Sequence, residues 1–104
     1  MIGAGPTDAV QELLELPRSE RREALEELVV EEFRTRLLMD DSEELPVTTS
    51  FFDLGCTSLV IADVKEELES TLGCAISANV LFNRPTIEQL VTYLADDVLR
   101  LSAS

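Results

Sequence analysis

Three segments of the chain, 20–39, 58–72 and 87–100, repeat apolar residues at steps of three and four. This spacing places the apolar side chains on one face of an α-helix, so each segment is predicted to be an amphipathic helix. The three apolar faces can only be buried against one another, which predicts an all-α fold, a small helical bundle. The residues of these faces are Leu25, Leu28, Val29, Phe33 and Leu37; Ile61, Val64, Leu68 and Leu72; and Ile87, Leu90, Val91, Leu94, Val98 and Leu101.

Short polar residues and a glycine mark the expected ends of these helices. Ser19 is expected to be the N-cap of the first helix, and Gly73 is expected to end the second. Thr86 and Gln89 have the spacing of a capping box at the start of the last helix. A short helical turn is expected at 78–82, which makes the prediction a four-helix bundle with three long helices and one short one.

The chain has 104 residues, which suits a single domain. Residues 1–16 are expected to be a flexible lead with a short helical segment, in which Val10, Leu13 and Leu14 share one side. Proline at position 17 ends that segment, because its ring cannot continue a helix. The folded domain is expected to cover 17–101, and 102–104 are expected to be a tail.

Charge excludes several kinds of partner. The chain carries 21 acidic and 8 basic residues, a net charge of -13. Such a surface repels phosphate backbones and anionic membranes, so neither nucleic acid nor membrane binding is expected. Protein partners should present basic patches. No apolar run is long enough to span a bilayer and the N-terminus lacks a signal-peptide pattern, which predicts a cytoplasmic protein.

Several catalytic chemistries are excluded by the residues that the chain lacks. It contains no histidine, so neither a Ser-His-Asp triad nor a histidine metal site can form. It has no P-loop or GxGxxG motif. Its two cysteines, Cys56 and Cys74, have no metal-ligand spacing and are expected to be free thiols. The sequence therefore predicts a non-catalytic protein without a metal site.

A long loop, 40–57, leads into the second helix, and long loops in compact domains are often functional. Its apolar residues are expected to anchor it, and Gly55 fits a backbone position with unusual dihedral angles. Ser58 lies where the loop meets the helix. A serine there is usually a cap, but a phosphate ester on its hydroxyl would face the unpaired N–H groups of the helix N-terminus. The expected anchors are Leu45, Val47, Phe51, Phe52 and Leu54.

Three stretches together resemble a known family. FFDLGCTSL, residues 51–59, resembles the D-L-G-x-D/x-S-L attachment motif of acyl and peptidyl carrier proteins. ELLELPRSERREALEELVVEEF resembles the lead-in and first helix of polyketide synthase carrier domains. LFNRPTIEQLVTYL resembles the later part of the same domains, where an F-[DN]-x-P-T element precedes a leucine-rich helix. Three motifs in the right order are far more specific than one, and the resemblance covers most of the chain.

The resemblance implies a right-twisting four-helix bundle with a 4′-phosphopantetheine arm on Ser58. The arm would come from coenzyme A through a magnesium-dependent phosphopantetheinyl transferase, and its thiol would hold an acyl group as a thioester. Supporting residues would be Asp53, Leu54, Gly55 and Thr57. The chain would present the acyl group to a ketosynthase, an acyltransferase or an acyl or aminoacyl ligase. It would be a monomer in isolation, either free-standing or part of a modular synthase.

In this family the residue after the serine and the outward face of the following helix contact partner enzymes. The corresponding residues here are Leu59, Ala62, Asp63 and Glu66. Thr57 departs from the family, which usually has Asp before the serine; modification should survive this change, with weaker recognition by some transferases. Val64 stands where carriers of branching pathways have tryptophan, which argues against that subclass.

Three other interpretations remain open at this point. A peptidyl or aminoacyl carrier of a nonribosomal peptide pathway, or a carrier that loads a starter unit, would share the attachment motif. A helical interaction module would use Ser58 only as a cap and would never acquire an arm. An enzyme is the weakest interpretation, because the chain lacks histidine.

Overall fold

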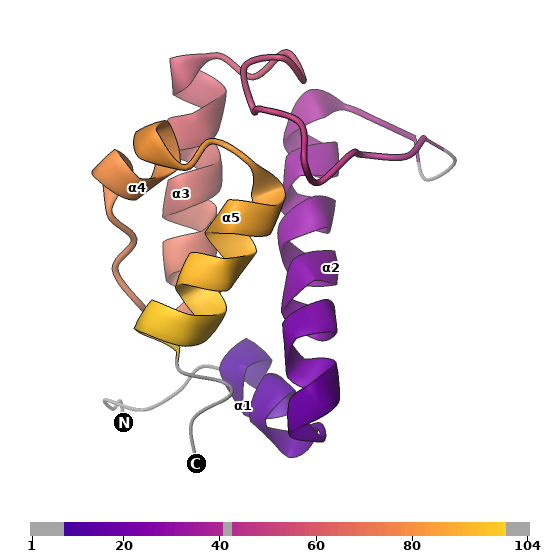
Figure 1. Ribbon diagram of the computed structural model, residues 1–104, viewed down its shortest axis with the longest axis vertical. Helices are drawn as coiled ribbons and strands as arrows, with labels where there is room; N and C mark the ends of the chain where they lie inside the picture. Colours follow the sequence, from indigo (N-terminus) through magenta and orange to yellow (C-terminus); the bar gives the residue numbers. More distant parts are fainter. Residues whose placement is uncertain (1–7, 41–42, 100–104) are drawn as a thin grey trace.

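Five α-helices make up the part of the chain that the computed structural model describes, residues 8–40 and 43–99 (Figure 1). Within these ranges no β-strand forms, and one isolated bridge pairs Ser50 with Thr86. The predicted all-α bundle, with three long helices and a short one, is confirmed. The elements are α1 (Asp8–Glu15), α2 (Arg18–Leu37), α3 (Ser58–Leu72), α4 (Ala78–Asn83), α5 (Ile87–Thr92) and the π-helical turn η1 (Tyr93–Val98) that continues α5.

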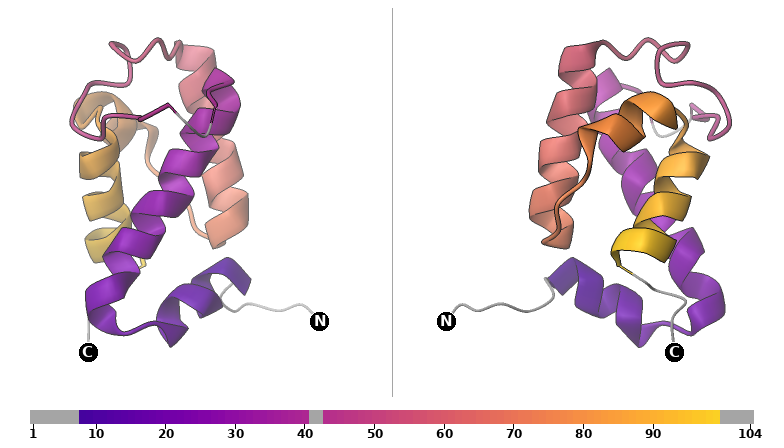
Figure 2. Two further views of the ribbon diagram at one scale, coloured as in Figure 1. Left: turned by 90° about the vertical axis from the view of Figure 1, so that its right-hand side faces the viewer. Right: turned by 60° about the vertical axis from the view of Figure 1, so that its left-hand side comes forward.

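Helices α2, α3 and α5 pack together as the body of the bundle, and the short helix α4 lies beside α3 (Figure 1). Helix α1 crosses one end of this body, and the loop from α2 to α3 crosses the opposite end (Figure 2). The N-terminal end of α3 therefore lies at the loop end of the molecule. None of the described helices combines the length and the apolarity that a bilayer-spanning segment needs.

The predicted apolar faces supply most of the core, and no polar side chain of the described residues is buried in it. Leu28, Leu37 and Val98 lie at its edge and are half-buried, and Leu101 lies outside the described residues. The residues buried from the predicted faces are Leu25, Val29, Phe33, Ile61, Val64, Leu68, Leu72, Ile87, Leu90, Val91 and Leu94. Hydrophobic periodicity thus identified most of the core.

Helix α1 is a packed part of this core. Val10 and Leu13 are buried against the bundle, whereas Leu14, expected on the same side, is exposed. The Arg21 guanidinium donates hydrogen bonds to the carbonyl oxygens of Leu14 and Leu16, at 2.8 and 2.9 Å. These bonds fix the end of α1 to the first turn of α2. The core therefore includes part of the predicted lead as well as the predicted folded domain.

The expected N-cap of α2 is wrong. The helix begins at Arg18, with Pro17 at the cap position, and Ser19 lies inside the first turn. Proline has a suitable φ for this position, and its carbonyl accepts the hydrogen bond from the Glu20 N–H at 2.8 Å. At the other end, Leu38 adopts a left-handed conformation with φ of 59° and is 90% exposed. The expected extension of the helix to Met39 is therefore also wrong.

The other expected helix ends agree with the structure. Gly73 ends α3 with φ of 65°, in the left-handed region that glycine tolerates. Thr86 is the N-cap of α5, and its Oγ1 accepts a hydrogen bond from the Gln89 N–H at 3.1 Å. The helix then widens into η1, where the Leu99 N–H donates to the Leu94 carbonyl at 2.8 Å. The expected end at Arg100 lies outside the described residues.

Candidate functional site

The loop that leads to Ser58 is anchored by its own apolar residues. Phe51 is fully buried, and its ring stacks on Phe33 of α2 with centroids 4.8 Å apart. The Phe51 N–H donates to the Pro85 carbonyl at 2.6 Å, and the Glu88 N–H donates to the Val47 carbonyl at 2.9 Å. These contacts join the loop to both α2 and the start of α5. Of the other expected anchors, Leu45 is buried and Val47 and Leu54 are half-buried.

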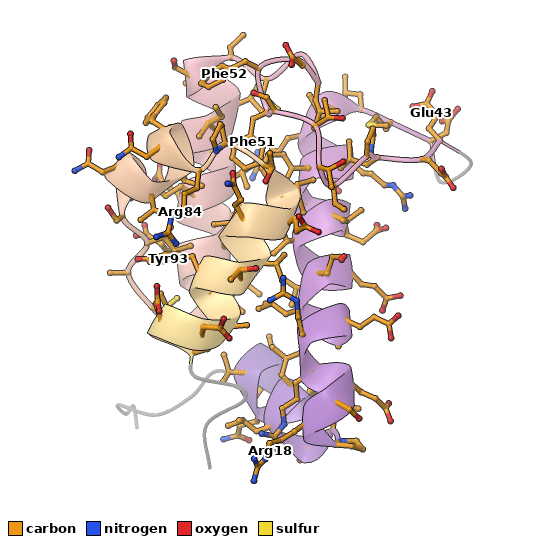
Figure 3. All side chains as sticks on the ribbon, in the orientation of Figure 1. Arg18, Glu43, Phe51, Phe52, Arg84 and Tyr93 are labelled. Atoms are coloured by element: carbon orange, nitrogen blue, oxygen red, sulfur yellow. The ribbon has the colours of Figure 1, made fainter. Side chains whose placement is uncertain are left out.

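Phe52 is not an anchor, which corrects the sequence prediction. Its side chain is 46% exposed, and its ring stacks on Phe82 of α4, itself 48% exposed, with centroids 6.2 Å apart. Figure 3 shows Phe51 among the helices and Phe52 at the edge of the molecule, beside the N-terminal end of α3. The surface near the start of α3 therefore carries an aromatic pair. The sequence analysis assigned Phe82 no place in the site, although it is the phenylalanine of the F-[DN]-x-P-T element.

A tight turn connects Phe51 to the start of α3. The Leu54 N–H donates to the Ser50 carbonyl at 3.0 Å, and the Cys56 N–H donates to the Phe51 carbonyl at 3.0 Å. Gly55 lies within the turn with φ of 97°, a conformation that residues with a Cβ rarely adopt. The predicted unusual backbone at Gly55 is confirmed. Because Phe51 is buried and the turn is internally bonded, the position of the first residue of α3 is fixed.

Thr57, not Ser58, is the N-cap of α3. The Thr57 Oγ1 accepts a hydrogen bond from the Val60 N–H at 3.2 Å. Ser58 is the first helical residue and is exposed, and its hydroxyl has no hydrogen-bond partner among the described residues. The expectation that Ser58 itself caps the helix is therefore wrong. Of the other predicted supporting residues, Asp53 is exposed in the turn and Leu54 packs against the core.

Neither cysteine has the properties of a reactive nucleophile. Cys56 and Cys74 are free thiols, and Cys56 is only 5% exposed although it lies two residues before Ser58. Burial raises the pKa of both thiols, and the charge of Glu69 raises that of Cys74 further. No group of acidic or cysteine side chains in the described part of the chain could hold a metal ion.

The predicted partner surface lies on the outward side of α3. Leu59 is 70% exposed, Ala62 and Glu66 are exposed, and Asp63 is half-buried. Steps of three and four place these residues along one face of the helix, beginning next to Ser58. The structure thus brings together an exposed hydroxyl, an exposed leucine and two acids.

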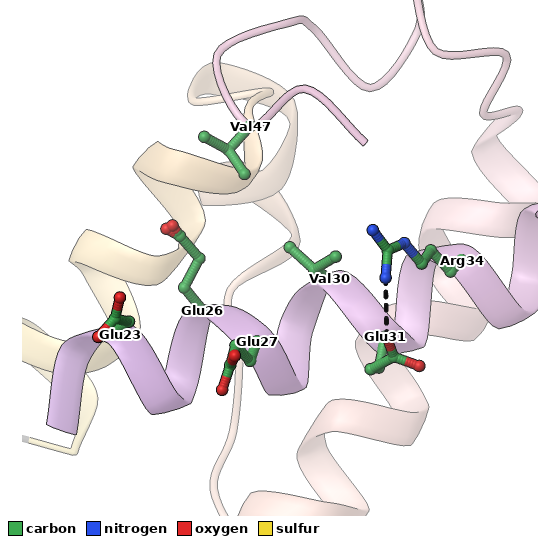
Figure 4. Close-up of a pocket in the computed structure, with 7 residues that line it drawn as sticks. All are labelled: Glu23, Glu26, Glu27, Val30, Glu31, Arg34 and Val47. Atoms are coloured by element: carbon green, nitrogen blue, oxygen red, sulfur yellow. Dashed lines mark hydrogen bonds and ion pairs between the residues drawn. The ribbon is translucent and has the colours of Figure 1, made fainter. Parts of the chain in front are cut away.

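A hollow of about 500 Å³ lies elsewhere, on α2 (Figure 4). None of its lining residues belongs to α3. Four glutamates of α2 line it beside Val30, Val47 and Arg34, and Arg34 is paired with one of them, Glu31, at 3.1 Å. It is a wide, acid-lined groove and contributes no residue to the surroundings of Ser58. The glutamates are Glu23, Glu26, Glu27 and Glu31.

Comparison with known proteins agrees with the geometry. The family model described as "Phosphopantetheine attachment site" matches residues 23–94, well over half of the chain. The chain therefore belongs to the phosphopantetheine-attachment family. Its structure is similar to that of the "A1-type ACP domain from module 5 of MLSA1", with a TM-score of 0.74 and 27% identity over 88% of this chain and 92% of that one.

The sequence relatives include several synthases. The chain is 35% identical over 81 residues to a phenolphthiocerol/phthiocerol polyketide synthase of Mycobacterium tuberculosis. The matched residues are 78% of this chain and 4% of that protein. It is 31% identical over 88 residues to the polyketide synthase GfsA of Streptomyces halstedii. Here the matched residues are 85% of this chain and 1% of that protein. The chain thus spans a small fraction of these relatives. The predicted resemblance to carrier domains of the polyketide synthase type is confirmed.

Proposed function

We propose that this chain is an acyl carrier that bears a 4′-phosphopantetheine arm on Ser58 and presents acyl intermediates to enzymes of polyketide biosynthesis. The observation that carries the proposal is the state of the Ser58 hydroxyl: exposed, at the first position of α3, and relieved of the capping role by Thr57. The family match and the polyketide synthase relatives support the same conclusion.

The residues around Ser58 fit the arm. The first N–H groups of a helix lack partners within the helix, and the positive end of its dipole favours an anion such as the phosphodiester. Space beside the turn is open, since a Cβ built on Gly55 would meet no atom within 4 Å. The arm supplies a terminal thiol, which forms the thioester. The fold leaves Ser58 exposed to solvent. The chain would supply no base to activate the hydroxyl, so the transferase must provide one.

The proposed partners follow from the face of α3 that adjoins Ser58. A phosphopantetheinyl transferase would act first, and a ketosynthase, an acyltransferase or an acyl ligase would follow. Leu59 offers these enzymes an apolar contact, and Glu66 offers an acid to a basic patch. Because the arm comes from coenzyme A, we place the chain in the cytoplasm. The chain itself would catalyse no step.

Intact mass after incubation with coenzyme A, magnesium and a broad-specificity phosphopantetheinyl transferase tests the proposal. The wild-type chain should gain one phosphopantetheine, and Ser58→Ala should gain none. Ser70→Ala is the matched control, because Ser70 is an exposed serine of the same helix, and it should load like the wild type. Ser58→Ala should keep its free energy of unfolding within about 0.5 kcal/mol of the wild type.

An unloaded wild type, beside a known carrier that loads, would call for the same assay on Thr57→Asp. Loading of that variant would show that Thr57 blocks recognition, and the attachment site would stand. Absence of loading in both would overturn the proposal in favour of an unmodified interaction module. Loading of Ser58→Ala would place the arm on another residue.

A further inference from the structure

One arginine of α2 reaches an acid of α3 that lies one helical turn after Asp63 of the proposed partner surface. The Arg36 Nε donates to Glu32 Oε2 at 3.0 Å within α2, and its Nη2 lies 3.6 Å from Oε1 of Glu67 on α3. The pKa of the Arg36 guanidinium is raised, first by the hydrogen bond to Glu32 and then by the charges of Glu32, Asp63 and Glu67. Asp63 precedes Glu67 by one helical turn, so the two acids lie on the same side of α3.

This arrangement divides the acids of α3 into two groups. Asp63 and Glu67 are one helical turn apart on the side of α3 where Arg36 pairs with Glu67. Glu66 forms no ion pair among the described residues and is exposed. A basic group of a partner would meet the full charge of Glu66, whereas at Asp63 and Glu67 it would meet Arg36 as well.

We propose that Arg36 is a specificity-determining residue of the partner surface. By pairing with Glu67, one helical turn from Asp63, it places a positive charge on this side of α3 and so disfavours contact there with the cations of a partner. The partner that fits this surface is a protein with an apolar pocket for Leu59 and a basic group opposite Glu66, and without a basic group opposite Asp63. The inference rests on the proposed function, since it concerns enzymes that act on the Ser58 side of α3.

Arg34 provides a matched control. It also pairs with a glutamate of its own helix, Glu31, at 3.1 Å, and Arg34→Gln changes the net charge by the same amount as Arg36→Gln. Arg34, however, lines the groove of Figure 4 together with residues of α2 and Val47, and it makes no ion pair with α3 among the described residues. A general effect of net charge should change the kinetics of both variants equally. An effect that depends on freeing Asp63 and Glu67 from Arg36 should appear only in Arg36→Gln.

The test is the kinetics of phosphopantetheine transfer to the full chain, with a broad-specificity phosphopantetheinyl transferase that has a basic docking surface as the probe. Arg36→Gln should lower the KM for the chain about two- to fivefold, the range expected for one exposed ion pair. Its kcat should be unchanged, because the Ser58 hydroxyl is unaffected. The gain should disappear at high salt. Arg34→Gln should leave the KM close to that of the wild type.

Arg36→Lys keeps the positive charge and should also leave the KM near the wild-type value, which separates charge from any effect on folding. An unchanged or raised KM in Arg36→Gln would overturn the proposal, as would an equal fall in Arg34→Gln. A wild-type chain that the transferase does not load at all would instead contradict the proposed function, so the two failures are distinguishable.

Discussion

Replacing Phe51 by alanine should release the loop that positions Ser58. Phe51 is fully buried and stacks on the equally buried Phe33, so its removal leaves a cavity between the loop and α2. Truncating a buried phenylalanine costs about 3–5 kcal/mol. The lost aromatic pair accounts for about 0.5–1.5 kcal/mol of this. Since domains are stable by about 5–15 kcal/mol, the variant should lose a large part of its stability.

The neighbouring residue gives the matched control. Phe52 is 46% exposed and touches only the partly exposed Phe82 among aromatic rings of the described residues. Its replacement by alanine should cost less than about 1.5 kcal/mol. Urea unfolding followed by circular dichroism measures both free energies, and an unchanged m-value would show that the difference is one of stability. Equal losses in the two variants, or a loss below about 1 kcal/mol in Phe51→Ala, would refute the assigned burial.

Two further predictions concern a backbone position and a carboxylate. Gly55→Ala should lower the free energy of unfolding in urea by about 1–3 kcal/mol, because φ of 97° is strained for alanine. Steric overlap adds nothing, since a Cβ at this position would meet no atom within 4 Å. An unchanged unfolding midpoint would show that the turn relaxes. Glu69 has a lowered pKa, first because its carboxylate accepts a hydrogen bond from the Ile76 N–H at 2.8 Å and then because of Lys65. The stability it contributes is therefore present above the ordinary glutamate pKa of about 4.3 and is lost as the pH falls through the lowered value. Glu69→Gln, melted between pH 6 and pH 3, should lose less stability on acidification than the wild type; equal losses would contradict this assignment.

Periodicity predicted the helices because their apolar faces are long enough to be unambiguous. The bounds of α3, Ser58–Leu72, were predicted without error, since Gly73 marks its end and its apolar spacing is regular. Irregular segments carry no such pattern. Phe51 and Phe52 are adjacent and chemically identical, so only the bonded turn and the stack on Phe33 determine which one is buried.

The candidate site was predicted in part for a similar reason. The attachment motif predicts Ser58 as the attachment residue, but two adjacent hydroxyl residues could each cap the helix. The backbone decides the matter, because Thr57 is the residue whose Oγ1 reaches the Val60 N–H. The pairing of Arg36 with Glu67 depends on how α2 and α3 are rotated against each other, and one helical pattern does not specify that rotation. The sequence therefore predicts which residues share a helix face, but it does not predict which residues of two faces are in contact.

The burial of Cys56 bears on the fidelity of a thioester carrier. A thiolate within reach of a thioester can take over its acyl group, and Cys56 lies two residues before Ser58, the proposed attachment residue. Cys56 is shielded from solvent and its raised pKa keeps it as the protonated thiol, which is a poor nucleophile. Cys74 is half-buried with a raised pKa as well. If Ser58 bears the proposed arm, the fold therefore disfavours transfer of the acyl group to the chain's own cysteines.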